Sequence, residues 1–185
     1  QRHSYEEIFQ VMRKMGLSYL QQEELYRRMV FNVMARNHDD HTKNFSFLMN
    51  QNGEWHLAPA YDLCYSYTPD GKWTNRHQLS LNGKQDGFVL EDLHTVGEKA
   101  GIRSYKINEV QEAVSHWNEF AKDCGVKEEH RTIIEKNLIF FSGKFHCINE
   151  PTVNNQEQIF LEAVKNEDFN KILTLKSQGY KPTKE

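Results

Sequence analysis

A polar stretch between a predicted helix and a predicted hairpin constrains the fold of this chain more than any other feature. Residues Asn37–Asn44 follow the segment Glu23–Ala35, in which apolar residues recur at a spacing of four. Such spacing predicts a helix with one packed face. The two short runs that follow, Phe45–Met49 and Glu54–Leu57, are separated by the turn signal Asn52-Gly53, and this pattern predicts a β-hairpin.

The polar residues around the hairpin have the spacing of a phosphoryl-transfer site. Asp39 precedes Asn44 by five residues, and Asp62 follows the second strand-like run. In protein-kinase catalytic loops, an Asp receives the proton of the acceptor hydroxyl and an Asn five residues later holds a metal ion. Carboxylate and amide oxygens are hard ligands that suit Mg²⁺. We therefore expect these three side chains to converge on one site.

Two joined motifs extend this pattern into a family resemblance. They are Asn37-x-Asp39-x-His41-x-Lys43-Asn44-Phe45-Ser46-Phe47 and, after the hairpin, Leu57-Ala58-Pro59-x-Tyr61-Asp62. Together they resemble the C-terminal lobe of HipA-type serine/threonine kinases, the toxin kinases of bacterial toxin–antitoxin systems. The resemblance spans about Tyr5 to Phe145. It implies an α+β fold that is mainly α: a protein-kinase-like C-terminal lobe whose small β-hairpin carries the catalytic and metal residues.

The resemblance also implies an activity. A kinase of this type would use ATP and Mg²⁺ to phosphorylate a Ser or Thr of a protein substrate, in the class of translation factors such as aminoacyl-tRNA synthetases. A DNA-binding antitoxin would be its partner. The chain has no counterpart of the Gly-rich loop and strand lysine that hold nucleotide phosphates. We therefore expect the nucleotide lobe to come from a longer protein, of which this chain is an internal part, or from a partner.

Each site residue has an expected role under this resemblance. Asp39 would act as catalytic base or orient the acceptor hydroxyl, while Asn44 and Asp62 would bind the metal and, through it, the nucleotide. Lys43 would neutralise the transferring phosphoryl group, with an exposed loop lysine as the alternative. His41 would order the loop by hydrogen bonding rather than shuttle protons. Asp40 is expected to face solvent.

Two other functions are compatible with these residues. The doublet His38-Asp39, with His41 and Asp62, could belong to a metal-dependent phosphohydrolase, although such a site usually needs further His and Asp ligands. The second alternative is a noncatalytic kinase-like module that binds nucleotide or a protein partner. The intact trio Asp39, Asn44 and Asp62 argues against it.

The remainder of the chain predicts helices and one long irregular connection. The connection covers 65–85, where Pro69, Asp70-Gly71 and Asn82-Gly83 are turn signals. Helices are predicted for 5–15, 90–100, 107–124 and 127–145. We expect one domain over 1–148 and a helical tail over 151–185, which resembles a single ankyrin repeat.

Composition excludes several environments and partners. The formal net charge of −3 gives no general attraction to nucleic acid or anionic membrane, and no apolar run is long enough to span a bilayer. The three cysteines are widely spaced and odd in number, which favours reduced thiols over disulfides. A cytoplasmic protein without direct nucleic-acid binding is expected.

Overall fold

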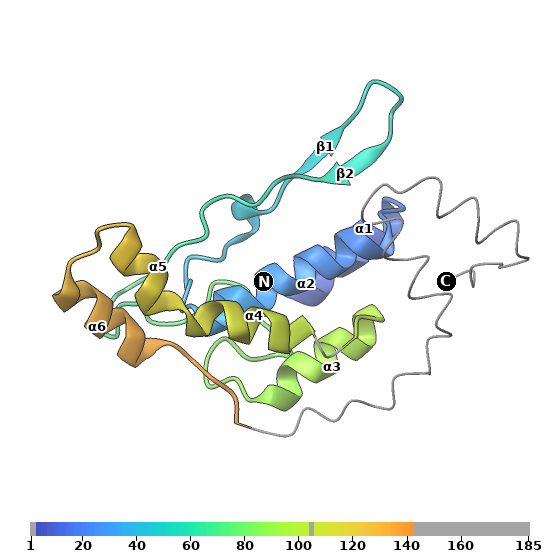
Figure 1. Cartoon of the computed structure of the whole chain (residues 1–185). Helices are drawn as coiled ribbons and strands as arrows, with labels where there is room; N and C mark the ends of the chain where they lie inside the picture. Colours follow the sequence, from blue (N-terminus) through green and yellow to red (C-terminus); the bar gives the residue numbers. More distant parts are fainter. Residues whose placement is uncertain (1–2, 104–105, 143–185) are drawn as a thin grey trace, which may run out of the picture. The chain divides into compact units, whose positions relative to one another are not determined.

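The computed structural model describes residues 3–103 and 106–142 of the 185-residue chain. This part is mainly helical with one two-stranded antiparallel sheet, which confirms the expected α+β class (Figure 1). The elements are α1 (Tyr5–Lys14), α2 (Tyr19–Met34), the 3-10 turn η1 (Thr42–Asn44), β1 (Phe47–Met49), β2 (Trp55–Leu57), α3 (Leu90–Ala100), α4 (Lys106–Ser115), α5 (Trp117–Asp123) and α6 (Glu128–Asn137).

Helix α1 begins at a complete capping box. The Ser4 hydroxyl accepts a hydrogen bond from the Glu7 backbone N–H, and the Glu7 carboxylate accepts one from the Ser4 backbone N–H. These bonds satisfy backbone donors that a helix start otherwise leaves unpaired. The helix buries four side chains on one face: Tyr5, Ile8, Phe9 and Met12.

Helix α2 is the central element of the core and packs against α1, α3 and α4. Its side chains Leu25, Met29 and Val33 are fully buried, so the apolar spacing in the sequence corresponds to a packed face. The helix also holds the chain after the hairpin: Gln21 Oε1 accepts from Leu57 N at 2.6 Å, and Arg28 Nη1 donates to Ala58 O at 3.0 Å. It ends at Met34, directly before the polar loop.

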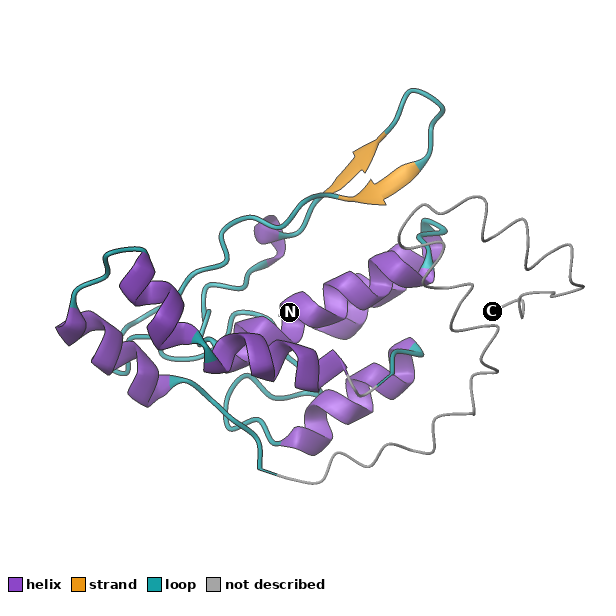
Figure 2. Cartoon of the chain, in the orientation of Figure 1, coloured by secondary structure: helices purple, strands orange, loops and turns teal. Residues whose placement is uncertain are grey.

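The hairpin projects away from the helices (Figure 2). Phe47 pairs with Leu57 and Met49 with Trp55. Its strands are shorter than the sequence suggested, and neither carries a candidate catalytic or metal residue. Asp39 and Asn44 lie before β1, and Asp62 lies after β2. These residues therefore occupy the loops at the base of the hairpin, on the two sides of it where the sequence placed them.

In the second half of the chain, sequence patterns predict the helices only in part. Helix α3 has the predicted bounds, but the segment predicted as one helix over 107–124 is two helices, α4 and α5, separated at His116. Helix α6 ends at Asn137 rather than near 145. The expected domain boundary near 148, the tail and its ankyrin-like repeat lie outside the described residues.

None of the helices in the described part of the chain combines the length and the apolar character that crossing a bilayer requires.

Candidate active site

Asn44 links the two acidic residues of the candidate site. The turn η1 brings its side chain back toward the loop, where Nδ2 donates to the Asp39 carbonyl oxygen at 2.9 Å and to Asp62 Oδ2 at 2.9 Å. One amide group thus contacts both acidic residues, of which one precedes the hairpin in the sequence and the other follows it. The structure places Asn44 in contact with the Asp39 backbone and the Asp62 side chain, while the convergence of all three side chains on one ligand stays a prediction.

Asp62 adopts an unusual backbone conformation at this site, with φ 55°. A non-glycine residue in the left-handed region is strained by about 1 kcal/mol or more, and such strain gathers at functional sites. Asn37 holds this conformation, since its Nδ2 donates to the Asp62 carbonyl oxygen at 3.1 Å. The Asp62 side chain remains exposed. Its carboxylate is therefore available to a ligand from solvent.

Asn37 and Ser66 support the candidate site through hydrogen bonds, and sequence reasoning assigned a role to neither. Ser66 Oγ accepts from Asp39 N at 3.0 Å and donates to Asn37 Oδ1 at 2.9 Å. Asn37 belongs to the motif, but no role for it follows from the sequence. Its side chain is buried, at 1% exposure, and this burial is visible only in the structure. Ser66 lies 27 residues from Asp39 in a loop, and no local pattern identifies it.

Asp40 is buried, so the expectation that it faces solvent was wrong. Its exposure is 1%, and its carboxylate accepts hydrogen bonds from Tyr5 Oη, His77 Nδ1 and the Gln78 backbone N–H at 2.7, 2.8 and 2.7 Å. A carboxylate can leave water when donors replace its hydration shell. These donors are 35 or more residues away along the chain, and for this reason the local sequence did not reveal them.

His38 also points into the protein, beside Asp40. Its ring lies 4.2 Å from the His77 ring and 4.9 Å from the Tyr67 ring, measured between centroids. Neither ring nitrogen has a hydrogen-bond partner among the described residues. Burial, with the neighbouring His77 and Arg36, lowers the pKa of His38 to about 4. The imidazole is therefore neutral at physiological pH.

His41 and Lys43 lie on the open side of the loop. His41 Nε2 is 3.8 Å from Asp39 Oδ1, too far for a hydrogen bond but close enough for an ion pair when the imidazole is protonated. The Lys43 carbonyl oxygen accepts from Tyr61 Oη at 2.7 Å, which ties the loop to the segment before Asp62. The Lys43 side chain is exposed and its ammonium pairs with no carboxylate in the described residues.

The donor set fits a Mg²⁺ shared with phosphates better than a phosphohydrolase centre. In the part of the chain that the structure describes, no three His, Cys, Asp or Glu side chains are placed to hold a metal ion. His38 is buried away from the exposed Asp62, so the proposed doublet does not form a ligand set. Asn44 and Asp62 supply two hard oxygen ligands, and Mg²⁺ commonly takes its others from water and phosphate.

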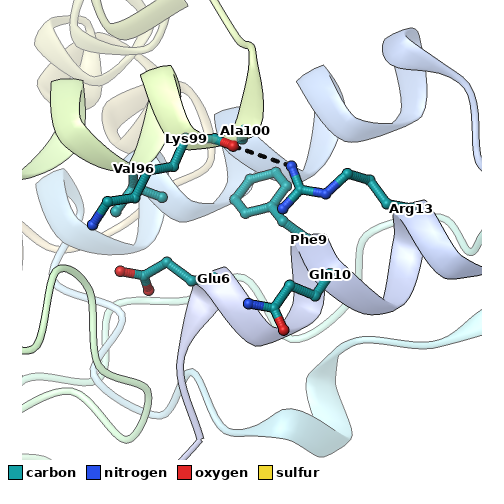
Figure 3. A pocket seen from close by; sticks show the side chains of 7 residues that line it. All are labelled: Glu6, Phe9, Gln10, Arg13, Val96, Lys99 and Ala100. Carbon is teal, nitrogen blue, oxygen red and sulfur yellow. Dashed lines mark hydrogen bonds between the residues drawn. The ribbon is translucent and has the colours of Figure 1, made fainter.

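A separate hollow lies between α1 and α3 (Figure 3). Its volume is about 220 Å³, and Arg13 Nη1 donates to the Lys99 carbonyl oxygen across it at 3.1 Å. It is lined by Glu6, Phe9, Gln10, Arg13, Val96, Lys99 and Ala100. It shares no residue with the candidate site and is not part of it.

Comparison with known proteins identifies the family of this chain. A family model described as "HipA-like C-terminal domain" matches residues 1–139. A Haemophilus influenzae protein that carries the name "Putative kinase" is 38% identical over 116 residues, which cover 54% of this chain and 34% of that protein.

Among solved structures, the HipA–HipB–operator DNA complex of the Shewanella oneidensis toxin–antitoxin system contains a chain of similar fold. The TM-score is 0.57 at 16% identity, over 72% of this chain and 33% of that one. The present chain therefore spans about a third of the length of each relative. Since the family model covers three quarters of the sequence and confirms the resemblance of its motifs, the chain belongs to the family of HipA-like C-terminal domains.

Proposed function

We propose that this chain is the catalytic half of a HipA-like protein serine/threonine kinase, which transfers the γ-phosphate of ATP to a Ser or Thr of a protein. The observation that carries the proposal is the double hydrogen bond of Asn44, which joins Asp39 and Asp62 at the base of the hairpin. Phosphoryl transfer requires mainly that its groups be held in place and that charge be neutralised. The Asn44 amide, which contacts both acidic residues, would hold these groups in place.

Asp39 is the residue that would act on the acceptor. Its side chain is 46% exposed, so a hydroxyl on the surface of another protein can reach it. The acceptor oxygen forms a bond to the γ-phosphorus, the bond from that phosphorus to the β-phosphate oxygen breaks, and ADP leaves. Asp39 orients the hydroxyl and takes its proton. Lys43, exposed on the same loop, neutralises charge on the phosphoryl group.

Asn44 and Asp62 would hold Mg²⁺ through Oδ1 and the carboxylate. The ion, when bound, supplies positive charge to the nucleotide phosphates. The chain's own part is to fix the two ligands relative to Asp39, which the Asn44 and Asn37 side chains do. Because the chain spans about a third of its relatives, the remaining grip on ATP would come from the rest of a longer protein or a partner.

The resemblance to the family supports a proposal for the partner and the substrate class. The solved relative is a toxin in complex with HipB and operator DNA, and we propose an antitoxin partner for this chain as well. The substrate would be a translation factor such as an aminoacyl-tRNA synthetase, reached in the cytoplasm.

Phosphate transfer from radiolabelled ATP with Mg²⁺ into whole bacterial lysate tests the proposal. The longest natural form of the protein is compared with Asp39→Asn and with Asp70→Asn, which alters an exposed loop carboxylate outside the site. We expect labelled protein bands with the wild type and with Asp70→Asn, and none with Asp39→Asn. Absence of label with the wild type would favour a noncatalytic binding module instead.

A further inference from the structure

The loop that carries Asp39 alternates between the interior and the surface. His38 and Asp40 are buried at 0% and 1% exposure, whereas the side chains of Asp39 and His41 are 46% and 40% exposed. Buried and exposed side chains thus alternate along residues 38–41. Asp40 is the immediate neighbour of Asp39, so an anchor on Asp40 restrains the backbone from which the Asp39 side chain projects.

Asp40 is held by donors from two distant segments. Oδ2 accepts from Tyr5 Oη on α1 and from His77 Nδ1, while Oδ1 accepts from the backbone N–H groups of Gln78 at 2.7 Å and Leu79 at 3.4 Å. Burial and the adjacent Asp40 charge raise the pKa of Tyr5, so the phenol keeps its proton and remains a donor. Both carboxylate oxygens of Asp40 thus have hydrogen-bond donors.

The same buried network continues to the other half of the site. Tyr5 Oη accepts from Asn32 Nδ2 at 3.0 Å, and Asn32 Oδ1 accepts from Asn37 Nδ2 at 3.0 Å. Asn37 then contacts the Asp62 carbonyl oxygen and Ser66, which accepts from Asp39 N. A continuous chain of hydrogen bonds thus runs from Asp40 beneath the loop to both acidic residues.

We propose that Asp40 is a positioning residue for phosphoryl transfer, whose buried carboxylate fixes the catalytic loop so that Asp39 faces the acceptor hydroxyl. The inference rests on the proposed kinase function and deepens it. Asp40 itself touches neither substrate nor metal. Its removal is therefore expected to reduce turnover by misdirecting Asp39, while the proposed metal ligands Asn44 and Asp62 keep their contact with each other.

Asp40→Asn is the sharpest variant. The fixed backbone N–H groups of Gln78 and Leu79 require an acceptor, so the amide oxygen is expected to face them and the NH₂ group to face Tyr5 and His77. The variant keeps the volume of the side chain and loses the contacts that tie the loop to α1. Displacement of a catalytic group by about 1 Å can lower a rate by roughly 10- to 100-fold.

Asp92→Asn is a matched control. Asp92 is also a buried carboxylate, at 3% exposure, and accepts from Lys84 Nζ, Asn82 Nδ2 and Val89 N at the start of α3. It has no hydrogen bond to the catalytic loop within the described residues. Both variants therefore disturb a buried carboxylate. Only Asp40→Asn disturbs one that contacts the catalytic loop.

Steady-state kinetics of the longest natural form, with thermal unfolding of each variant, test the proposal. We expect Asp40→Asn to lower kcat by at least about tenfold while KM for ATP changes by less than about threefold. Asp92→Asn should lower only the unfolding temperature. Hydrogen exchange of the amides of Gln78 and Leu79 should accelerate in Asp40→Asn and not in Asp92→Asn, since the loop that carries their acceptor is no longer tied to Tyr5 and His77.

Equal kcat values for Asp40→Asn, Asp92→Asn and wild type would overturn the positioning role while leaving the kinase function intact. An inactive wild-type protein would instead overturn the proposed function and this inference with it. If Asp40→Asn does not fold, Tyr5→Phe makes the same test, because it removes one donor to Asp40 and retains the ring. An unchanged kcat in folded Tyr5→Phe would then count against the proposal.

Discussion

Asn44 has the greatest influence on the candidate site of any single residue, because one side-chain amide contacts both acidic residues. Nδ2 donates to the Asp39 carbonyl oxygen and to Asp62 Oδ2, and the proposed function assigns the remaining atom, Oδ1, to the metal ion. The residue is half-buried. Its contribution to function is therefore expected to exceed its contribution to stability.

Asn44→Ala is predicted to abolish most phosphate transfer and to raise the Mg²⁺ concentration needed for whatever transfer remains. Its free energy of unfolding should fall by only about 1 kcal/mol, since the lost hydrogen bonds are partly solvated. A Mg²⁺ titration of transfer, with urea unfolding, measures both. Asn50→Ala is the control, because Asn50 makes comparable hydrogen bonds to Glu54 at the far end of the hairpin. Similar Mg²⁺ dependence in both variants would contradict the ligand role.

His38 gives the fold a predictable dependence on pH. Its pKa is lowered to about 4 in the folded protein, against an ordinary value near 6.5 in the unfolded chain. The unfolded state therefore binds a proton first as the pH falls. Stability is full above about pH 6.5 and is lost progressively toward pH 4.

His38→Phe is predicted to remove this loss while it keeps the aromatic contacts with His77 and Tyr67. Between about pH 7.5 and about pH 5, the wild type should lose about 2 kcal/mol more of its unfolding free energy than His38→Phe. Urea unfolding at both pH values provides the measurement. His56→Gln, at an exposed position on β2, controls for loss of an imidazole and should behave as the wild type. Equal losses in all three proteins would contradict the buried, neutral state of His38.

The site residues differ in how far the sequence could predict them. Asp39, Asn44 and Asp62 were predictable because a local spacing and a hairpin bring them together. The burial of Asp40 was not, because its donors come from α1 and from residues 77–79. Nothing in the identity of two neighbouring aspartates indicates which of them faces inward.

At the scale of elements, the packing of α3 on α2 depends on a missing side chain. Gly97 of α3 lies against the Tyr26 ring, and a β-carbon there would stand 2.9 Å from Tyr26 Oη and 3.1 Å from Cζ. The phenol also donates to the Leu93 carbonyl oxygen at 2.9 Å, which fixes the ring against the helix. The glycine thus permits the close approach of the two helices.

Gly97→Ala is predicted to destabilise the protein by about 1 to 3 kcal/mol through overpacking, although alanine favours helix by about 1 kcal/mol. The cost should shrink in a Tyr26→Phe background, where the nearest atom is absent. A double-mutant cycle of unfolding free energies measures this coupling. Strictly additive effects would show that the contact does not limit the approach of α3.

The elements themselves were predictable where signals are local. The bounds of α3 follow from acidic residues in the first turn and the left-handed Gly101 at its end. The break between α4 and α5 has no such signal, since neither Gly nor Pro occurs at 115–117. The irregular segment after Asp62 was expected, yet Leu79 and Leu81 from it are buried in the core. Their burial depends on contacts with distant helices, which periodicity does not encode.

At the scale of the whole molecule, the described residues would supply the acidic side of the proposed phosphoryl-transfer site. The candidate site offers carboxylates and an amide for a metal, and its one nearby exposed cation on the loop is Lys43. ATP carries several negative charges, and phosphate recognition normally also uses backbone N–H groups and a lysine. The matched part of this chain covers only about a third of each relative. Most of the affinity for nucleotide is therefore expected to depend on residues outside these 185.

The 185-residue chain alone is predicted to bind Mg²⁺–ATP at least about tenfold more weakly than the longest natural form, because two halves of a site contribute jointly to one affinity. Calorimetric titration of both proteins, each with an Asp62→Asn counterpart, makes the comparison. In the longer protein the substitution should reduce affinity sharply, since the exposed Asp62 carboxylate is the charged ligand on this side. In the short chain it should remove the residual binding. Equal affinity in the two wild-type proteins would mean that the described lobe already contains a complete nucleotide site, and the division of the site between two halves would have to be abandoned.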